Sequence, residues 1–469
     1  MTDPGTVAVL DIGKSNIKLS ACTALGEVLE TLTTQNPVLP GPPWQHHDLA
    51  SLNPWVMQSL AALSRRHPLA RFITSGHGSG GVLVGADPDA HGDGCVLPMV
   101  DYEQPVPPGL NAAYIPLAGG FFDRGSAVMM AATHTARQMF WAKRDRPDQF
   151  ATARWLLGVP QYWAWRLSGV AVSEVSILGA QSHLWNVPHR RWAPIVTAQG
   201  WQALLPPFAA AGADLGPIRP ALAQHFGLPA DLRIHAGVHD SSANFYRYQA
   251  AGLTDFCVVS TGTWIVAMAD KITLPRLIEN RGMTCNADIT GAALGGALTM
   301  GGREYAAVAG DQPGGALTDT DLLGRLIDQG TMAVPTFGAN DGQFPGSAGQ
   351  GRIAGPPPEG PRQRHALAVL YTALLTVACA DTLDPDRRLV LDGSFLRDPV
   401  FASLVAALRP GRETLTNSES YGIAAGAALL CAQGRAGSTL HLAPPARLSS
   451  LPGLSRYAAT WRHLTQGQT

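Results

Sequence analysis

The stretch Val-Ala-Val-Leu-Asp-Ile-Gly-Lys-Ser-Asn-Ile-Lys-Leu-Ser at residues 7–20 has the pattern of two strands joined by a short polar turn. Val7 to Leu10 is a continuous apolar run, and apolar alternation resumes from Ile17 to Cys22, which predicts a β-hairpin. Small residues and backbone N–H groups in such a turn let the chain approach the terminal phosphates of ATP closely. The glycine spacing is not that of a Walker loop, and an ordinary hairpin turn is the alternative. The candidate nucleotide-binding residues here are Asp11, Gly13, Lys14, Ser15, Asn16 and Lys18.

A second hairpin of the same kind is predicted in the second half of the chain. The residues from Asp255 to Met268 alternate around the turn Ser-Thr-Gly-Thr-Trp at 260–264. Hydroxyl groups and glycine N–H groups at a strand turn suit a phosphate clamp, so Thr261, Gly262 and Thr263 are candidate nucleotide-binding residues. Thr-Gly turns are common, and an unspecialised turn is again the alternative. Two halves that each begin with such a hairpin suggest an internal duplication, although no residue-level repeat is visible.

The candidate catalytic residue is Asp240, in the stretch Ile-His-Ala-Gly-Val-His-Asp-Ser-Ser-Ala at 234–243. Phosphoryl transfer to a hydroxyl depends mainly on positioning and charge neutralisation. A carboxylate that accepts the hydroxyl proton and faces the γ-phosphate and Mg²⁺ supplies the remaining chemistry. Asp11 and Asp240 are therefore the candidate Mg²⁺ ligands. The structural alternative is that Asp240 caps the helix that follows it, and His239 either orients the substrate or packs.

In their order and spacing these three segments resemble the FGGY family of carbohydrate kinases, within the actin-like ATPase superfamily. Gly-Val-His-Asp at 237–240 is similar to the Gly-x-His-Asp of the rhamnulokinase-like and fuculokinase-like members, in which that Asp is the general base. The resemblance extends from residue 7 to about residue 431. It implies an α/β fold of two ribonuclease-H-like domains with a cleft between them. Residues 1–248 would bind the sugar and carry the first phosphate motif, residues 249–469 would bind the nucleotide, and the hairpins would grip Mg-ATP.

The resemblance also implies the substrate-binding residues. Ser-Gly-His-Gly at 75–78 resembles the family's Gly-Gln-x-His loop, which makes His77 a candidate partner for a sugar hydroxyl. Pro-Met-Val-Asp-Tyr-Glu at 98–103 resembles the family's loop ending in Trp-x-Asp, with Met99 where Trp is common. Asp101 is the second candidate, and His239 and Asp240 complete the predicted substrate set. The alternative for Asp101 is an ordinary carboxylate at a strand end.

The adenosine motif departs most from the family pattern. Leu-Val-Leu-Asp-Gly-Ser-Phe-Leu-Arg at 389–397 resembles a strand followed by Gly-Gly-Gly-Ser and a downstream Asn. Gly393 and Ser394 carry over as nucleotide-binding residues. Asp392 stands where a first glycine is common, and Leu396 and Arg397 replace small or amide residues, so no Asn contact to adenine is predicted.

Composition limits the class of protein and its partners. A chain of 469 residues with 46% hydrophobic and 15% charged residues predicts two folded domains. A net charge of −1 offers no general attraction to nucleic acid or to an anionic membrane. Six cysteines without a Cys-x-x-Cys pair suggest neither a zinc site nor a disulfide framework. We expect a cytoplasmic protein with a small-molecule partner, and a homodimer fits the resemblance.

Periodicity predicts several further elements. The apolar run from Ala366 to Ala380 is too short for the ~20 residues of a membrane span and predicts a buried helix. The other predicted elements are strands or strand-like segments at 71–75, 96–101 and 388–391, and helices at 133–143, 155–167, 366–383 and 423–431.

The sequence therefore favours an ATP- and Mg²⁺-dependent kinase of a small sugar, a ketose or deoxyketose by its resemblance. A polyol kinase or a sugar-acid kinase is the alternative among enzymes. A non-catalytic member that binds sugar or nucleotide is the second alternative, and Asp392 and Leu396 motivate it. An actin-like or chaperone-like ATPase is disfavoured, because such proteins lack a sugar loop like residues 75–103.

Overall fold

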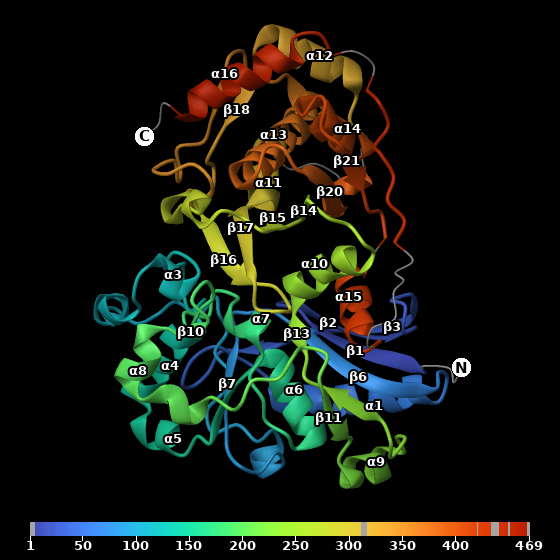
Figure 1. Ribbon diagram of the computed structural model, residues 1–469. Coiled ribbons are helices and arrows are strands. Elements are labelled where there is room, and N and C mark those ends of the chain that lie inside the picture. The colour runs from blue at the N-terminus through green and yellow to red at the C-terminus, as the bar shows by residue number, and fades with distance from the viewer. Residues whose placement is uncertain (1–4, 311–316, 420, 433–439, 449–450, 467–469) are drawn as a thin grey trace. The chain divides into compact units, whose positions relative to one another are not determined.

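The chain forms two structural units in the computed structural model (Figure 1). The structure describes all residues except 1–4, 311–316, 420, 433–439, 449–450 and 467–469. The first unit comprises Met1–Leu253, Cys285–Ala293 and Tyr421–Leu440, and the second comprises Thr254–Thr284, Leu294–Ser420 and His441–Thr469. Two short segments from the second half of the chain thus pack with the first unit, and the domain boundary at residue 248 stays a prediction.

The first unit is built on a mixed sheet with the strand order β11-β12-β6-β1-β2-β3, in which β13 also pairs with β6. β1 and β2 are antiparallel, with Leu10 opposite Leu19, and β1 and β6 are parallel. The predicted hairpin and the predicted strand at 71–75 are confirmed. The strands are β1 (Thr6–Ile12), β2 (Asn16–Cys22), β3 (Val28–Gln35), β6 (Leu69–Gly76), β11 (Asp214–Pro217), β12 (Arg233–His235) and β13 (Val238–His239).

Successive residues of β1 point to opposite faces of this sheet, and helices cover both faces. Ala8 and Leu10 belong to the core that includes residues of α1 (Leu49–Ser64) and α6 (Val159–Ser168). Val7 and Val9 belong to the core on the other face, together with residues of α10 (Asp240–Ala250) and α15 (Gly422–Leu430). The predicted close packing of α15 is confirmed at Gly426, where a Cβ would lie 1.9 Å from the Ala243 carbonyl oxygen.

Two local predictions in this unit were wrong in part. Residues 96–101 form no strand; Cys95 and Val100 make only isolated bridges, and Pro98 between them has no N–H to donate to a ladder. Residues 155–158 are not helical but form β8 (Trp155–Gly158), which pairs with β7 (Gly81–Val84). The helix begins only at Val159, because Pro160 is suited to a first helical turn and not to a helix interior.

The remaining elements of the first unit are short, except for the predicted helix at 133–143, which is confirmed as α4. They are β4 (Val38–Leu39), β5 (His46–His47), α2 (Leu110–Tyr114), α3 (Phe121–Arg124), α4 (Thr135–Asp145), α5 (Pro147–Ala151), α7 (Val175–Leu178), β9 (Trp185–Asn186), β10 (Arg191–Trp192), α8 (Pro194–Gln199) and α9 (Pro220–Phe226).

The second unit repeats the central pairing of the first. Its sheet has the order β16-β17-β15-β14-β20-β21, with β14 and β15 antiparallel and β14 and β20 parallel. β14 and β15 are the predicted second hairpin, so the predicted duplication is confirmed at the level of topology. The strands are β14 (Phe256–Thr261), β15 (Ile265–Asp270), β16 (Met283–Ala287), β17 (Ala293–Thr299), β20 (Arg388–Gly393) and β21 (Thr414–Thr416), with a separate pair β18 (Met332–Val334) and β19 (Arg352–Ala354).

The central helix of the second unit is α13 (Gly360–Leu383). Among the described residues it is the one helix long and apolar enough to cross a membrane, but 83% of its most apolar window is buried inside the structure. The predicted buried helix is therefore confirmed. The other helices of this unit are α11 (Gly301–Ala309), α12 (Thr320–Gln329), α14 (Pro399–Leu408) and α16 (Leu454–Gln466).

Candidate active site

The turn of the first hairpin is held by a side chain from outside it. Gly13 N–H donates to the Asn16 carbonyl oxygen at 3.1 Å, and a Cβ at Gly13 would lie 2.9 Å from that oxygen. The Asn36 amide donates to the Gly13 carbonyl oxygen at 2.8 Å, and Asn36 N–H donates to the Ser15 carbonyl oxygen at 2.9 Å. Ser15 and Asn16 remain exposed at the tip. The turn is thus preformed, with its small polar residues open to a ligand.

Asp11 and Asp240 lie at the same edge of the first sheet. Asp11 is opposite Lys18 on β2 and level with Ser75 on β6, and Ser75 is level with Val238 on β13. Because β1, β6 and β13 are parallel, their carboxyl ends coincide, and Asp240 follows β13 directly. The charge of Asp240 adds to burial in raising the pKa of Asp11 to about 7, whereas Lys18 opposes the rise. The two carboxylates therefore repel each other across this edge.

This pair of carboxylates fits a magnesium ion. Mg²⁺ is typically bound by one or two carboxylates, with water and substrate phosphates as its other ligands. No group of three or more His, Cys, Asp or Glu side chains is arranged to hold a metal within the described ranges. Asp11 and Asp240 thus suit an ion that arrives with a phosphate ligand, and a divalent cation would relieve their repulsion.

Asp240 is not the cap of its helix. The N-cap of α10 is His239, and Asp240 occupies the first helical position, where its Oδ1 accepts a hydrogen bond from the Ser241 hydroxyl at 3.0 Å. His239 Nε2 lies 3.2 Å from the same oxygen, and burial lowers the pKa of His239. On its other side, His239 Nδ1 is 3.0 Å from the hydroxyl of Ser242. The structure therefore places His239 directly against the candidate base.

A buried carboxylate fixes the backbone just before Asp240. Glu174 accepts hydrogen bonds from Ser176 N–H at 3.0 Å and from the Ser176 hydroxyl at 2.6 Å. That hydroxyl in turn accepts a hydrogen bond from His239 N–H at 3.1 Å. Burial raises the pKa of Glu174 to about 7 despite these donors. The sequence does not reveal that Glu174 and Ser176 hold His239, because Ser176 lies 63 residues before His239 in the chain.

Lys14 and Asp101, predicted for different ligands, form an ion pair. The Lys14 ammonium donates to Asp101 Oδ1 and lies 3.6 Å from Glu103 Oε2. It is also 5.2 Å from the centre of the Tyr102 ring, on which it exerts a cation–π attraction. The Asp101 side chain is only 5% exposed. The structure thus brings the side chain of Lys14, predicted to contact the nucleotide, to the predicted sugar loop.

Two imidazoles complete this polar group. His77 packs edge-on against the Tyr102 ring at 5.3 Å, and the ring of His47 is 6.2 Å from that of His77. Burial lowers the pKa of each of these histidines to about 4, so both are neutral at pH 7. His47 was not identified from the sequence. Its one local signal, the adjacent Asp48 that caps α1, indicates a helix start and not a binding residue.

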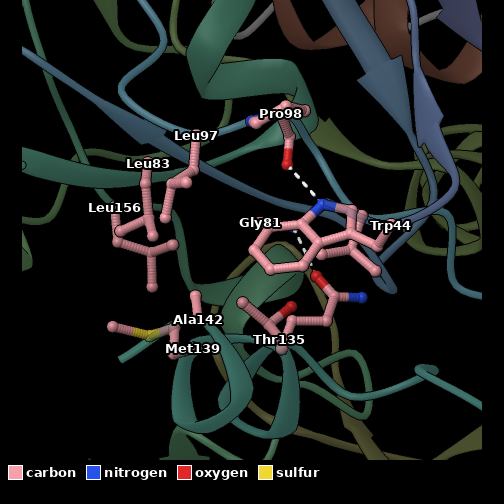
Figure 2. Close-up of a pocket in the computed structure, with 11 residues that line it drawn as sticks. Trp44, Gly81, Leu83, Leu97, Pro98, Thr135, Met139, Ala142 and Leu156 are labelled. Atoms are coloured by element: carbon pink, nitrogen blue, oxygen red, sulfur yellow. Dashed lines mark hydrogen bonds between the residues drawn. The ribbon is translucent and has the colours of Figure 1, made fainter. Parts of the chain in front are cut away.

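The backbone around Asp101 is held by the segment that carries His47. The Trp44 indole N–H donates to the Pro98 carbonyl oxygen at 2.9 Å, and Asp101 N–H donates to the Gln45 carbonyl oxygen at 2.9 Å. Figure 2 shows the Trp44 ring reaching Pro98 above a small, mainly apolar cavity that Leu83, Leu97 and Leu156 help to line. This packing holds the backbone of residues 98–101, so the Asp101 carboxylate is positioned before any ligand binds.

The candidate nucleotide residues of the second unit also meet at one edge of their sheet. Thr261, at the end of β14, is level with Gly393 at the end of β20, and its hydroxyl donates to the Asp392 carbonyl oxygen at 2.8 Å. Gly393 has a φ of 99°, and a Cβ there would lie 2.1 Å from the Thr261 carbonyl oxygen. Gly262 and Thr263 form the adjacent turn, and the Ser394 hydroxyl lies 3.4 Å from the Thr261 carbonyl oxygen. The five predicted residues are therefore neighbours.

Two family models match the chain. One, described as the FGGY family of carbohydrate kinases, N-terminal domain, matches residues 119–245. The other, described as carbohydrate kinase FGGY, C-terminal domain, matches residues 253–439. The residues matched lie in both halves of the chain and in the order of the two domains.

The individual proteins to which the chain is similar are also carbohydrate kinases. An L-fuculokinase of Salmonella typhi is 25% identical over 306 residues, which span 60% of this chain and 60% of the length of that protein. The solved structure of a carbohydrate kinase from Novosphingobium aromaticivorans is 28% identical, with a TM-score of 0.86 over 98% of this chain and 100% of that one. A xylulose kinase from Lactobacillus acidophilus shares the fold at 16% identity, with a TM-score of 0.79 over 99% of this chain and 96% of that one.

Proposed function

The chain belongs to the FGGY family of carbohydrate kinases, and on that premise we propose that it transfers the γ-phosphoryl group of ATP to a hydroxyl of a small neutral sugar. A ketose or deoxyketose is the expected acceptor. The observation that carries the proposal is the edge of the first sheet, where the parallel strands β1, β6 and β13 bring Asp11, His77 and Asp240 to their carboxyl ends. The proposed base, the proposed cation ligands and the proposed hydroxyl-binding groups thus belong to one unit.

In the proposed reaction Asp240 accepts the proton of the acceptor hydroxyl as that oxygen bonds to the γ-phosphorus. The bond between the γ-phosphorus and the bridging oxygen breaks, and ADP leaves with its electron pair. Magnesium, when bound, neutralises the charge of the phosphates. Asp11 and Asp240 would hold the ion, and the contact of His239 with Asp240 Oδ1 fixes the orientation of the carboxylate.

The proposed nucleotide contacts follow from the two preformed turns. In the first unit the turn residues Gly13, Ser15 and Asn16 would donate to phosphate oxygens, with Lys18 adding positive charge next to Asp11. In the second unit Thr261, Gly262 and Thr263 would contact phosphates. Gly393 and Ser394, at the adjoining strand end, would contact the adenosine. While its ammonium is paired with Asp101, the proposed contact of Lys14 with the nucleotide is through its backbone.

The charges around the sugar loop favour a neutral acceptor over a sugar acid. Asp101, Glu103 and Asp240 contribute three carboxylates to this region, and the Lys14 ammonium is already paired with Asp101. A substrate carboxylate would therefore be repelled, whereas hydroxyl groups can donate to carboxylates and accept from neutral imidazoles. A polyol is also compatible with this arrangement, and the departures at Asp392 and Leu396 are the one motive for a non-catalytic member.

The proposal is tested by measuring ADP release from Mg-ATP with a panel of ketopentoses, 6-deoxyketohexoses, their aldose epimers, polyols and sugar acids. Turnover confined to one stereochemical class of neutral sugar is the expected result. Sugar acids as the preferred acceptors would overturn the charge argument. No turnover with any acceptor, while ATP binding measured by calorimetry is intact, would overturn the proposed activity.

A further inference from the structure

His47 is a buried polar side chain whose nitrogens have no partner. The residue is 2% exposed, and neither Nδ1 nor Nε2 has a hydrogen-bond partner among the described residues. A buried polar group left unsatisfied is destabilising, so native proteins rarely keep one without a ligand or water to satisfy it. The imidazole is neutral at pH 7, and so offers one donor and one acceptor.

The backbone fixes the position of this ring from two sides. His47 pairs with Val38 across the β4–β5 ladder, and its N–H donates to the Met99 carbonyl oxygen at 3.1 Å. The preceding residue, His46, bridges to Val100, next to Asp101. These pairings fix the backbone that carries the ring, and burial of the side chain restricts its rotation. It is preorganised beside the Asp101 carboxylate.

The distance between His47 Nε2 and Asp101 Oδ1 allows one oxygen atom to bridge them. His47 Nε2 is 3.9 Å from Asp101 Oδ1, too far for a direct hydrogen bond. An oxygen placed about 2.8–3.0 Å from both atoms could accept from an Nε2–H and donate to the carboxylate. In the structure Asp101 Oδ1 instead accepts hydrogen bonds from the Glu103 N–H at 3.2 Å and from the ammonium of Lys14. Its long flexible stem allows it to move aside when a ligand hydroxyl replaces it.

The neighbours of the two histidines give the order of groups along the site. His77 follows Gly76, which is level with His239 at the end of β13, whereas His47 belongs to the β4–β5 ladder and its ring is 6.2 Å from that of His77. His77 thus lies on the side of the candidate base, and His47 lies beyond it. A hydroxyl bound by His47 belongs to the part of the sugar distant from the hydroxyl that Asp240 would deprotonate.

We propose that His47 is a specificity-determining residue that, together with Asp101, binds one acceptor hydroxyl remote from the phosphorylated one. This inference rests on the proposed function and adds to it a residue and a substrate requirement. The enzyme discriminates by that hydroxyl, because a sugar lacking it leaves the imidazole unpaired again, and such polar sites reject analogues that lack the matching group.

The test compares His47→Phe, His47→Gln and the control His46→Gln. Phenylalanine keeps the ring and removes both nitrogens, and glutamine restores a polar group. His46 is the adjacent residue, whose Nδ1 already has the Trp44 carbonyl oxygen as a partner at 2.9 Å. With the best panel ketose, His47→Phe should raise the acceptor KM about 10–100-fold with the ATP KM within twofold of wild type. His47→Gln should recover part of the loss, and His46→Gln should be neutral.

Analogues of that ketose, each lacking one hydroxyl, identify the contact. One analogue should lose about as much affinity on the wild-type enzyme as His47→Phe loses with the parent sugar. The two losses should not add when that analogue meets the variant, because they remove the same interaction. Sugar binding is measured by calorimetry without ATP, and circular dichroism checks that each variant is folded. If His47→Phe does not fold, the loss of affinity caused by His47→Gln is compared instead with the losses of the analogues on the wild-type enzyme.

The outcomes separate the inference from the function on which it rests. An acceptor KM and affinity within twofold of wild type in the folded His47 variants would overturn the inference while leaving the kinase intact, and water would then be the partner of the imidazole. Additive losses across the analogue series would overturn it as well. If the wild-type enzyme phosphorylates no sugar in the panel, the proposed function itself fails.

Discussion

The ammonium of Lys14 forms an ion pair with the carboxylate of Asp101, although the two residues are 87 positions apart in the sequence. This pair joins the turn of the first hairpin to the sugar loop. A sugar that uses Asp101 must compete with Lys14, so the binding of sugar frees an ammonium beside the turn that is proposed to hold phosphates. We therefore expect Lys14 to affect the order in which sugar and ATP bind.

Removing Lys14 should destabilise the protein. In Lys14→Met the Asp101 carboxylate, 5% exposed, loses its counter-charge. Breaking a buried pair by removing one partner is costly, but Lys14 itself is partly exposed, so we expect a loss of about 1–2 kcal/mol in the free energy of unfolding. Urea unfolding followed by circular dichroism measures it. The matched control is Lys143→Met, whose ammonium donates to the backbone and side-chain oxygens of Gln199 at the surface.

Adding Asp101→Asn to Lys14→Met tests the pair directly. The loss caused by Lys14→Met should be smaller when the carboxylate is already absent, because the two changes remove one interaction. Strictly additive free energies would show that Lys14 and Asp101 do not interact in solution.

Substituting the candidate base should remove turnover while preserving binding. In Asp240→Asn the side chain keeps its size and cannot accept the hydroxyl proton, so we expect kcat to fall by about 10²–10⁴-fold. The affinity for the acceptor, measured by calorimetry without ATP, should stay within a few-fold of wild type. Asp89→Asn is the control, since Asp89 pairs with Arg219 at the surface. A variant Asp240→Asn that retains more than a tenth of the turnover would assign the base elsewhere.

The repulsion between Asp11 and Asp240 should appear as a pH-dependent stability. The pKa of Asp11 in the folded protein is about 7, above its ordinary value of 3.8. A raised pKa means that the protonated form favours folding, a contribution present at acid pH and lost as the pH rises through about 7. Asp11→Asn mimics the neutral form. Without nucleotide or Mg²⁺, it should stabilise the protein at pH 8 by about 1–2 kcal/mol more than at pH 5.

Urea unfolding at the two pH values measures this difference, and Mg²⁺ provides a further check. Magnesium should stabilise the wild-type protein more than Asp11→Asn, because the variant has lost one of the two proposed ligands. Equal gains from the substitution at pH 5 and pH 8 would contradict the electrostatic account of this pair.

The parts of the fold predicted from the sequence are those that local patterns determine. Both hairpins and the buried helix at 366–383 follow from periodicity over consecutive residues, and the structure has them as β1–β2, β14–β15 and α13. The segment 96–101 was misread because Pro98 interrupts a pattern that otherwise resembles a strand. Residues 155–158 continue the helical pattern of the run that follows, but in the structure they pair with β7, for example Trp155 with Val84. Periodicity cannot reveal this partner, because it lies more than 70 residues earlier in the chain.

The candidate site also contains residues that could be predicted from the sequence and residues that could not. The turn residues stand next to strands with clear patterns, whereas Asp240 follows the two-residue strand β13 and was identified from its motif and the family resemblance. His47 could not be predicted, because its burial depends on a two-residue ladder to Val38 and on a hydrogen bond to Met99. The contact of the Lys14 side chain with the sugar loop depends likewise on where the chain brings Asp101. Such contacts between distant segments carry no local signal.

A final prediction concerns the backbone of the second unit, where two glycines should respond oppositely to alanine. Gly393 has a φ of 99°, and its Cβ would lie 2.1 Å from the Thr261 carbonyl oxygen and 2.8 Å from the Thr261 nitrogen. The atoms that would have to move are backbone atoms of β14, the strand that carries the proposed phosphate turn. Gly393→Ala should therefore lower the free energy of unfolding by about 2–4 kcal/mol and raise the ATP KM more than the acceptor KM.

Gly324 is the matched control for this substitution. It lies within α12, and a Cβ there would meet no atom within 4 Å, so alanine adds helix propensity without a clash. Gly324→Ala should raise the free energy of unfolding by about 0.5–1 kcal/mol and leave both KM values unchanged. Thermal and urea unfolding of the two variants give the comparison. If Gly393→Ala proves as stable as wild type, the close approach of β20 to Thr261 is relaxed in solution, and the proposed grouping of Thr261, Gly393 and Ser394 loses its geometric basis.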